Sequence, residues 1–425
     1  MSQAARNAAF ARAEQEYLGW YGDPLASLNA ALDADPGFLL GYTTIAALNA
    51  LGGVPGTAEP IQRALSAAEA LSPGASTREK HHFAAARHWA AGEITAAAHE
   101  WELALARDPH DLLALHLAHD THFFLGDAAK LRDVPLSVLP AQAPNSKARG
   151  YVLGMAAFGL EESGAYEAAE RAGREAVSIN QADTWAVHAV AHVLEMQGRV
   201  AEGIAWLRGL EPHWTAAPSL AVHQNWHLCL YLLEEGRFDE VLEIYGTKIR
   251  ATDSTAILDL VDAAALLWRL ELLGVNAGAR WERLALAWGQ YADDHVLAFN
   301  DVHIAFTLDG AGDTRTLAAQ QESLARYSTA GTENARFSAE IGQPLIEALH
   351  AFRRGDFART VSLMAPLRTR LHQIGGSHAQ RDLFIQTLVI AAFRAGQPEL
   401  AARVIAERAR GTAGTPRAFA PYLAK

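Results

Sequence analysis

The chain has 425 residues, roughly two to three times the usual length of one domain, so it folds either as several domains or as one long repeat array. Half of the residues are hydrophobic and 20% are charged, which excludes a largely disordered chain. The net charge is −12 and no run of Lys or Arg is longer than two residues, so we expect no nucleic-acid partner.

The sequence also indicates a compartment. The single cysteine, Cys229, excludes an intramolecular disulfide and a zinc site made of thiolates, and it fits a reducing environment. Residues 1–6 lack the apolar core of a signal sequence, and no stretch reaches the uninterrupted apolar length that spans a bilayer. We therefore expect a cytoplasmic protein with no membrane partner.

Regularly spaced glycines divide the chain into units of 34 to 43 residues, and most units hold two amphipathic segments of helical length. A glycine between two helices can adopt the left-handed conformation that ends the first helix without a side-chain clash. The pattern is typical of stacked helical hairpins. The turn glycines are Gly22, Gly56, Gly92, Gly126, Gly164, Gly198, Gly236, Gly274, Gly312, Gly355 and Gly396.

In chain order, the early units end in proline. Pro73 and Pro109 each lie 17 residues after a turn glycine, where the second helix of a hairpin should stop. The proline-rich segment 134–146 is predicted to be a longer connection rather than a helix. Later units place an aromatic residue two positions after the turn glycine, at Tyr166, Phe238 and Phe357.

These features predict an all-α fold, a right-handed α-solenoid of about eleven tetratricopeptide-like helical hairpins with a concave polar pocket. Each hairpin buries its apolar face against its neighbours, so we expect one superhelical domain over residues 1–425, with a C-terminal tail, 411–425, that frays. The alternative is a closed α/α toroid, whose hairpins should be longer than these.

Nine of the 18 histidines fall in four short windows that precede a turn glycine, and therefore lie on the first helices of hairpins. In tetratricopeptide folds these helices line the concave surface, so polar side chains from separate windows should converge on one groove. The windows contain His116, His119, Asp120 and His122; His188, His192 and Glu195; His223, Trp226 and His227; and His295, Asn300, Asp301 and His303.

His188, His192 and Glu195 form the clearest polar stripe. At about 100° per residue, their i, i+4, i+7 spacing places them within roughly 60° of one another around a helix. A neutral imidazole held by a carboxylate can act as a general acid or base near pH 7. The carboxylates available for this are Asp120 for His119, Glu195 for His192, and Asp301 for His303.

The same stripe admits a second chemistry. Two histidines at i, i+4 with a carboxylate one turn later can chelate a divalent metal, here through His188, His192 and Glu195, and His223 with His227 repeats the spacing. The sequence lacks the H-E-x-x-H order of zinc proteases, a phosphate-binding loop and a serine nucleophile elbow. We therefore expect no cofactor, with a divalent metal as the alternative.

Aromatic and C-terminal residues complete the candidate site. Trp185 and Trp226 would suit a ligand with a flat or apolar part, although ordinary packing between hairpins uses such rings too. In the segment 375–382, Arg381 could anchor a carboxylate through two hydrogen bonds or could pair with Asp382.

Together these stretches resemble the tetratricopeptide repeat protein 38 family over nearly the whole chain. The resemblance implies a tetratricopeptide-like superhelix and points to these residues, but it implies no particular reaction. His116, His122 and His378 depart from the family's pattern and are not site candidates. The resemblance is carried by His119-Asp120 with residues 123–126, residues 182–192 with Glu195-Met196, His223 with Trp226-His227, residues 299–301 with His303, and residues 379–382.

We therefore predict that the chain binds a small polar or aromatic molecule and acts on it by acid–base chemistry of the hydrolase or lyase type. The alternatives are a non-catalytic adaptor that holds a peptide in the groove, and a small-molecule carrier. The predicted catalytic residues are His119, Asp120, His188, His192, Glu195, His227, Asp301 and His303. The predicted ligand contacts are His223, Trp226, Trp185, Asn300, His295, Arg381 and Asp382.

Overall fold

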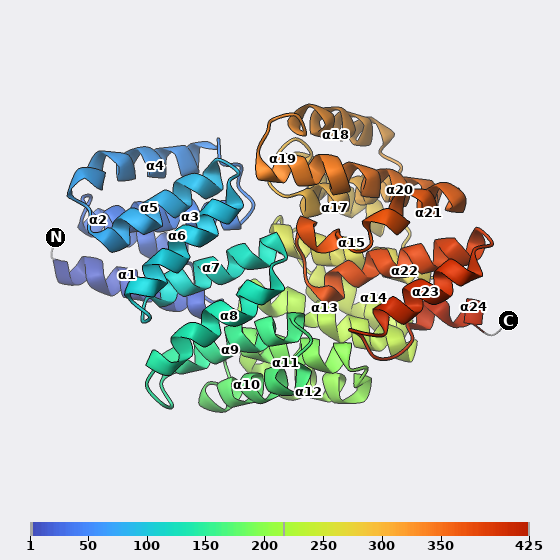
Figure 1. The fold of residues 1–425 in the computed structure, drawn as a ribbon, viewed down its shortest axis with the longest axis horizontal. Helices are drawn as coiled ribbons and strands as arrows, with labels where there is room; N and C mark the ends of the chain where they lie inside the picture. Colours follow the sequence, from blue (N-terminus) through green and yellow to red (C-terminus); the bar gives the residue numbers. More distant parts are fainter. Residues whose placement is uncertain (1–2, 216, 424–425) are drawn as a thin grey trace. The chain divides into compact units, whose positions relative to one another are not determined.

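The computed structural model describes residues 3–215 and 217–423, and among these residues every regular element is a helix (Figure 1). The predicted all-α fold of helical hairpins is confirmed. The chain divides into two compact units, so the single superhelical domain over residues 1–425 stays a prediction. The first unit contains residues 1–190, 210–221 and 332–334, and the second contains residues 191–209, 222–331 and 335–425.

The first unit consists of consecutive helices that pair as hairpins, α1 with α2 and so on to α9 with α10. Short 3₁₀ turns follow two of the second helices. The helices are α1 (Gln3–Gly19), α2 (Pro24–Ala34), α3 (Leu39–Leu51), α4 (Glu59–Leu71), η1 (Ser72–Gly74), α5 (Thr77–Ala90), α6 (Ile94–Arg107), α7 (Leu112–Leu125), α8 (Ala128–Val138), η2 (Leu139–Ala141), α9 (Lys147–Glu162) and α10 (Tyr166–Ile179).

The division between the units falls inside four helices and once in the loop before α19, between residues 331 and 332. Each of these helices is continuous through the division. They are α11 (Thr184–Met196), α12 (Val200–Trp214), α13 (Pro218–Glu235) and α19 (Glu333–Phe337).

The second unit continues the pairing of helices, and two of its helices contain a turn of π-helix. One of these turns, η5, joins α19 to α20 without a break. The elements are α14 (Phe238–Ile244), η3 (Tyr245–Ile249), α15 (Ile257–Leu272), α16 (Arg280–Trp288), η4 (Gly289–Tyr291), α17 (Ala298–Ala311), α18 (Thr314–Tyr327), η5 (Ser338–Gly342), α20 (Gln343–Arg353), α21 (Phe357–Leu367), η6 (Leu371–Ile374), α22 (His378–Arg394), α23 (Pro398–Arg408), η7 (Arg417–Phe419) and α24 (Ala420–Leu423).

Ten of the eleven predicted turn glycines have left-handed backbone, with φ between 64° and 81°, as the end of a first helix requires. The exception is Gly56. The left-handed residue of that turn is Gly53, with φ of 90°. Gly56 serves a different purpose, because a Cβ added there would lie 2.0 Å from the carbonyl oxygen of Ala90. A close approach between turn and helix, rather than backbone conformation, requires glycine at that position.

Several turns pair the glycine with an aspartate that begins the second helix. Gly126 ends α7, and the carboxylate of Asp127 then accepts a hydrogen bond from the backbone N–H of Lys130 at 3.0 Å. The glycine thus allows the left-handed turn that ends one helix, and the aspartate caps the start of the next. The same arrangement recurs at Gly312-Asp313 and Gly355-Asp356.

The predicted connection over residues 134–146 is partly helical, which corrects that prediction. α8 runs through Pro135 to Val138, and the connection that follows η2 is short. Proline lacks the N–H that would donate to the carbonyl of Leu131. Gly159 of α9 packs against that carbonyl so closely that an added Cβ would lie 2.1 Å from its oxygen. α9 therefore packs closely against the turn of α8 in which the carbonyl of Leu131 receives no hydrogen bond from Pro135.

The C-terminal segment, for which the sequence predicts fraying, has specific contacts in the second unit. The backbone N–H of Ala413 donates to the carbonyl of Met196 at 2.6 Å, and that of Arg417 donates to the carboxylate of Glu234 at 2.8 Å. Phe419 is fully buried. Residues 413–419 therefore form part of the packed structure of this unit.

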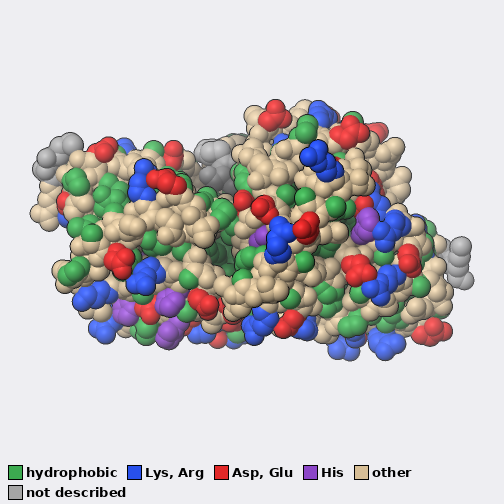
Figure 2. Space-filling view, turned by 90° about the horizontal axis from the view of Figure 1, so that it is seen from above, with side chains coloured by type: hydrophobic (Ala, Val, Ile, Leu, Met, Phe, Trp, Pro, Cys, Tyr) green, Lys and Arg blue, Asp and Glu red, His purple; other side chains and the backbone are tan. Residues whose placement is uncertain are grey.

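The exposed side chains carry both signs of charge. On the face seen in Figure 2, acidic and basic side chains are interspersed, so this face presents no broad field of one sign. Within the described part of the chain, none of the helices combines the length and the apolar character needed to cross a membrane.

Candidate functional site

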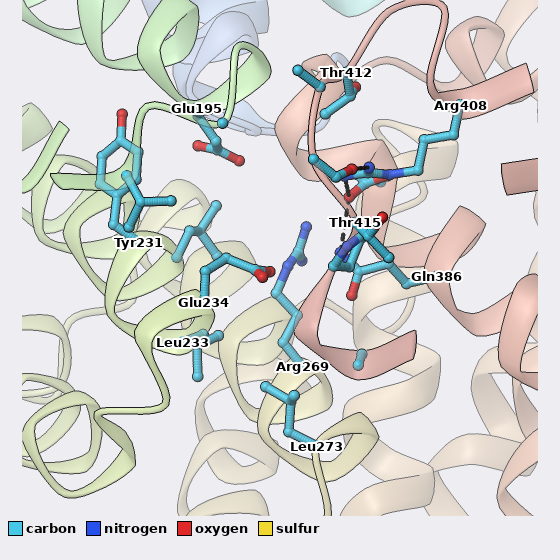
Figure 3. A pocket seen from close by; sticks show the side chains of 18 residues that line it. Glu195, Tyr231, Leu233, Glu234, Arg269, Leu273, Gln386, Arg408, Thr412 and Thr415 are labelled. Carbon is cyan, nitrogen blue, oxygen red and sulfur yellow. Dashed lines mark hydrogen bonds and ion pairs between the residues drawn. The ribbon is translucent and has the colours of Figure 1, made fainter. Parts of the chain in front are cut away.

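A pocket of about 310 Å³ lies in the second unit (Figure 3). Three of its walls are the C-terminal ends of first helices, contributed by Glu195 of α11, Glu234 of α13 and Arg269 of α15. α22, α23, the segment 412–418, and Gly198 and Val200 at the start of α12 supply the rest. First helices of separate hairpins thus bring polar side chains to one cavity within this unit.

Arg269 lines the pocket, and its side chain lies between Glu234 and Thr415 in the view of Figure 3. Its Nη2 donates to the carbonyl of Ala379 at 2.5 Å, whereas its buried Nη1 has no hydrogen-bond partner in the described part of the protein. Burial lowers the pKa of Arg269, although the negative charges of Asp382, Glu195 and Glu234 oppose that shift. An arginine remains cationic despite such a shift, so the pocket holds a positive charge with one donor group unused.

Asp382 forms the opposite wall together with Arg408 of α23. The guanidinium donates to both carboxylate oxygens, at 2.7 and 2.9 Å, and the amide of Gln386 donates to one of them at 2.8 Å. Burial alone would raise the pKa of Asp382, but the charge and hydrogen bonds of Arg408 outweigh it and lower the pKa. Asp382 is therefore ionised and neutralised by a partner inside the wall.

Two roles are predicted for Arg381: anchoring a carboxylate, or pairing with Asp382. Arg381 donates to the carbonyl of Gly376. Adjacent residues on a helix point about 100° apart, so one turns toward the preceding loop while the other faces α23.

Glu195 connects the pocket to a buried histidine. One of its carboxylate oxygens lies 2.9 Å from Nδ1 of His227 on α13, and its side chain is 18% exposed while that of His227 is fully buried. The sequence predicts His192 as the imidazole held by Glu195, and the structure assigns this hydrogen bond to His227 of the next first helix. The carboxylate faces the pocket and the imidazole lies behind it.

Two further histidines lie beside His227. The ring centroids of His192 and His227 are 4.4 Å apart, and those of His223 and His227 are 4.8 Å apart. Nδ1 of His223 lies 2.8 Å from a carboxylate oxygen of Asp262 on α15, and burial raises the pKa of that carboxyl group. The structure therefore brings three predicted histidines together and adds a carboxylate that the sequence analysis had not singled out.

Trp226, predicted to contact a ligand, is fully buried. Its ring stacks on His223, with centroids 5.2 Å apart, and the guanidinium of Arg269 lies 5.6 Å from its ring centroid. The indole therefore supports the residues around the pocket rather than lining it, since a cation over an aromatic face is held by the ring quadrupole.

The predicted orientation of His303 by Asp301 is wrong. Asp301 lies 2.9 Å from Nδ1 of His295, and the other ring nitrogen of His295 meets the hydroxyl of Ser323. Residues two positions apart on a helix point about 200° apart, so Asp301 and His303 face opposite sides of α17. His295 has a φ of 47°, which is uncommon for a residue with a side chain. These contacts hold it just before the start of this helix.

His303 lies in an aromatic environment. Its Nδ1 lies 2.8 Å from the carbonyl oxygen of Phe299, and its ring contacts those of Phe306 and Phe384. Burial, helped by the positive charge of Arg269, lowers the pKa of His303 to about 4. The residue is therefore neutral at pH 7. Asn300, near the start of the same helix, is partly exposed.

In the first unit, Asp120 accepts a hydrogen bond from the hydroxyl of Tyr17 at 2.6 Å and lies 3.5 Å from Nε2 of His116. It does not orient His119, which contradicts the predicted pair, because neighbouring helical residues diverge by about 100°. His116, which the resemblance had set aside, takes the place of His119. Burial raises the pKa of Asp120.

The other candidates of the first unit form an aromatic cluster. The ring of Trp185 stacks on Trp20, with centroids 5.4 Å apart, and lies 5.5 Å from His119 and 4.8 Å from His188. Burial, with the nearby imidazoles of His116 and His122, lowers the pKa of His119 well below its usual value. Trp185, His119 and His188 therefore belong to one aromatic cluster.

Three residues that build the pocket were missed in the sequence. Glu234 and Arg408 belong to ordinary amphipathic helices and carry no signal. Arg269 does carry one, since it directly follows the apolar run 263–268 and is therefore a charged residue on a helix that must be buried.

No family model matches the chain. Among solved structures, yeast Tom70 is similar over 98% of this chain and 93% of its own, with 12% identity and a TM-score of 0.36. A structure of Naa15/Naa10 bound to HypK-THB is similar over 94% of this chain and 68% of its own, with 13% identity and a TM-score of 0.26. At these values neither likeness supports an assignment of function.

Proposed function

We propose that the pocket of the second unit binds a small polar molecule whose acidic group pairs with Arg269. The observation that carries this proposal is the guanidinium itself, which is buried in the pocket wall with no hydrogen-bond partner for Nη1 in the described residues. A buried donor left without a partner costs about 1–3 kcal/mol, and more when it is charged. A carboxylate or phosphate on the ligand would offset that cost with a charge-assisted hydrogen bond.

The remaining charges restrict the ligand further. Asp382 is neutralised by Arg408, and the carboxylates of Glu195 and Glu234 also line the pocket. A molecule that combines an acidic group with a hydroxyl or amino group would complement both signs. The volume of about 310 Å³ lies at the lower end of the range of roughly 300–1,000 Å³ that is common for ligand sites, which favours a compact metabolite.

Acid–base chemistry of the hydrolase or lyase type is the second candidate function, and the contact between Glu195 and His227 favours it. A carboxylate that lines the pocket can accept a proton from a bound molecule, and the proton then stays on the carboxylate, which the imidazole N–H continues to hold by its hydrogen bond. In this version Glu195 is the group that meets the substrate. His227 holds it in position.

A peptide adaptor or a carrier are the alternatives. An adaptor groove must admit an extended chain, whereas the segment 412–418 of this protein forms part of the pocket wall and has its own contacts there. This arrangement favours a small molecule over a peptide. The buried Cys229 suits the cytoplasm that we propose as the compartment.

The proposal is tested by equilibrating the purified chain with a small-molecule extract of cells, removing unbound material and identifying what stays bound by mass spectrometry. Wild type should retain a compound with an acidic group. Arg269→Gln keeps a donor for the carbonyl of Ala379 but removes the charge, so it should lose that compound at least tenfold.

Arg250→Gln is the matched control, because Arg250 is an arginine of the same unit that does not line the pocket. It should retain the compound as wild type does. Equal retention by wild type and Arg269→Gln, or no compound retained by a folded wild type, would contradict the proposal.

A further inference from the structure

Three imidazoles converge in the interior of the second unit, behind Glu195. His192 comes from α11, and His223 and His227 come from α13, where they are spaced i, i+4. One ring nitrogen from each lies within 4.8 Å of the nitrogens of the other two. All three residues are at most 5% exposed. Side chains from two helices therefore bring three nitrogen ligands to one buried point.

Carboxylates fix the orientation of two of these rings. Asp262 lies 2.8 Å from Nδ1 of His223, and Glu195 lies 2.9 Å from Nδ1 of His227. A neutral histidine that donates its Nδ1–H to a carboxylate carries its lone pair on Nε2. Carboxylate–histidine pairs of this kind accompany metal-ligating histidines, because they set the tautomer and raise the basicity of the ligand.

We propose that His192, His223 and His227 bind one divalent transition-metal ion, with Asp262 and Glu195 as outer-sphere partners. Imidazole ligands without thiolates suit Zn²⁺ best among the common ions, with Ni²⁺, Cu²⁺ and Fe²⁺ as competitors. Three histidines leave one position of a tetrahedral ion for water or another ligand. The ligand set differs from the predicted His188, His192 and Glu195, since Glu195 acts through His227 instead.

Metal binding requires the three ring nitrogens to move closer together than they are in the structure. Tetrahedral ligands about 2.05 Å from zinc are roughly 3.3 Å from one another, so the ring nitrogens must approach by at most about 1.5 Å from the 4.8 Å limit. Rotation of χ2 in each ring supplies movements of this size. The i, i+4 spacing also places His188 on the same face of α11 as His192, one turn earlier.

This metal proposal is independent of the ligand proposal, although Glu195 takes part in both. Its readout is metal bound by the purified chain, with no organic ligand added. Arg269→Gln should bind zinc as wild type does, so failure of the pocket to hold a ligand and failure of the histidines to hold a metal are separate results.

The test uses the full chain, produced without a histidine tag, stripped with a chelator and then titrated with Zn²⁺ against a competing chromophoric chelator. We expect about one tightly bound Zn²⁺ per chain and a higher melting temperature. Co²⁺ in its place should give the visible absorption of a tetrahedral nitrogen site. Asp262→Asn, which keeps the size of the side chain, should weaken zinc binding about 10–100-fold.

Removing one ligand in His192→Ala, His223→Ala or His227→Ala should weaken binding more than Asp262→Asn does. His303→Gln, a buried histidine of the same unit, and His99→Ala, an exposed histidine of the first unit, are the controls and should bind zinc as wild type does. The proposal is overturned if stripped wild type takes up no stoichiometric Zn²⁺. It is also overturned if Asp262→Asn and the three ligand variants keep wild-type affinity.

Discussion

Nδ1 of His227 lies 2.9 Å from a carboxylate oxygen of Glu195, which joins a fully buried imidazole on α13 to a carboxylate on α11 that lines the pocket. The two residues are 32 positions apart in the sequence, and each lies on the first helix of its hairpin. Any change at Glu195 therefore acts on the pocket and on the histidines behind it at once. A conservative substitution can separate these two roles.

Glu195→Gln keeps an oxygen that can accept the hydrogen bond from His227 but removes the negative charge. We expect the melting temperature to change by only a few degrees, while affinity for the retained compound falls about tenfold, the effect of losing one charged hydrogen bond. Isothermal titration with that compound measures the affinity. Glu235→Gln, an exposed neighbour of the pocket on α13, should bind as wild type does. Equal affinity in both variants would show that Glu195 does not meet the ligand.

His303 should make the protein less stable in acid. Burial lowers its pKa to about 4 in the folded state, whereas the unfolded chain keeps the ordinary value of 6.5. Between these values the unfolded state binds more protons, so stability falls as the pH drops from 6.5 toward 4. From pH 6.5 to pH 5 this group alone should cost about 2 kcal/mol.

The measurement is the free energy of unfolding by urea for wild type and His303→Gln at both pH values. Glutamine does not titrate, so the difference between the two proteins should change by that amount in favour of the variant at pH 5. Parallel pH dependences would mean that the imidazole titrates normally in the fold.

Gly203 of α12 permits the close approach of Tyr231, whose ring belongs to the pocket wall and whose hydroxyl donates to the carbonyl of Ala191 at 2.5 Å. A Cβ at position 203 would lie 2.2 Å from the tyrosine ring. Gly203→Ala should therefore lower the free energy of unfolding by about 1–3 kcal/mol, the usual cost of overpacking. Tyrosine ring movement should also weaken ligand binding.

Gly209 on the same helix is the control, since a Cβ there meets nothing within 4 Å. Gly209→Ala should be neutral or stabilise the helix by up to about 1 kcal/mol. Denaturant unfolding measures the free energy of unfolding of both variants. If helix propensity alone mattered, both substitutions would raise that free energy equally, whereas the packing argument predicts a loss at position 203.

The fold could be predicted from the sequence because its signal is local and repeated. Turn glycines such as Gly126 mark where a first helix ends, and the helical period fixes which residues share a face. Gly56 shows the limit of this reasoning, since glycine is required there by the close approach of Ala90 and not by the backbone conformation of a turn. Spacing cannot tell these two requirements apart.

The site was only partly predictable, because most side chains of the site contact residues of a different helix. Residues close in sequence, such as Asp301 and His303, diverge around one helix, while Glu195 meets His227 and Asp382 meets Arg408 through packing between helices. Sequence windows identified which residues are polar and buried. They gave no register between neighbouring helices, so the contacts of Glu195 with His227, Asp301 with His295 and Asp120 with His116 were not predicted.

The resemblance to the tetratricopeptide repeat protein 38 family stays a prediction. It pointed to buried polar residues in both units, and Glu195 and Asp382 are the two that line the pocket described above. Arg269, on which the proposed function rests, was not among the residues that carried it.

The most direct test of the proposed function is a crystal structure of the chain carrying the compound that it retains from the small-molecule extract. We expect density in the pocket of the second unit, with an acidic group of the compound within hydrogen-bond distance, about 2.7–3.2 Å, of Nη1 of Arg269. A polar group of the compound should face Glu195. Density for the compound elsewhere on the protein, with only water beside Arg269, would contradict the account.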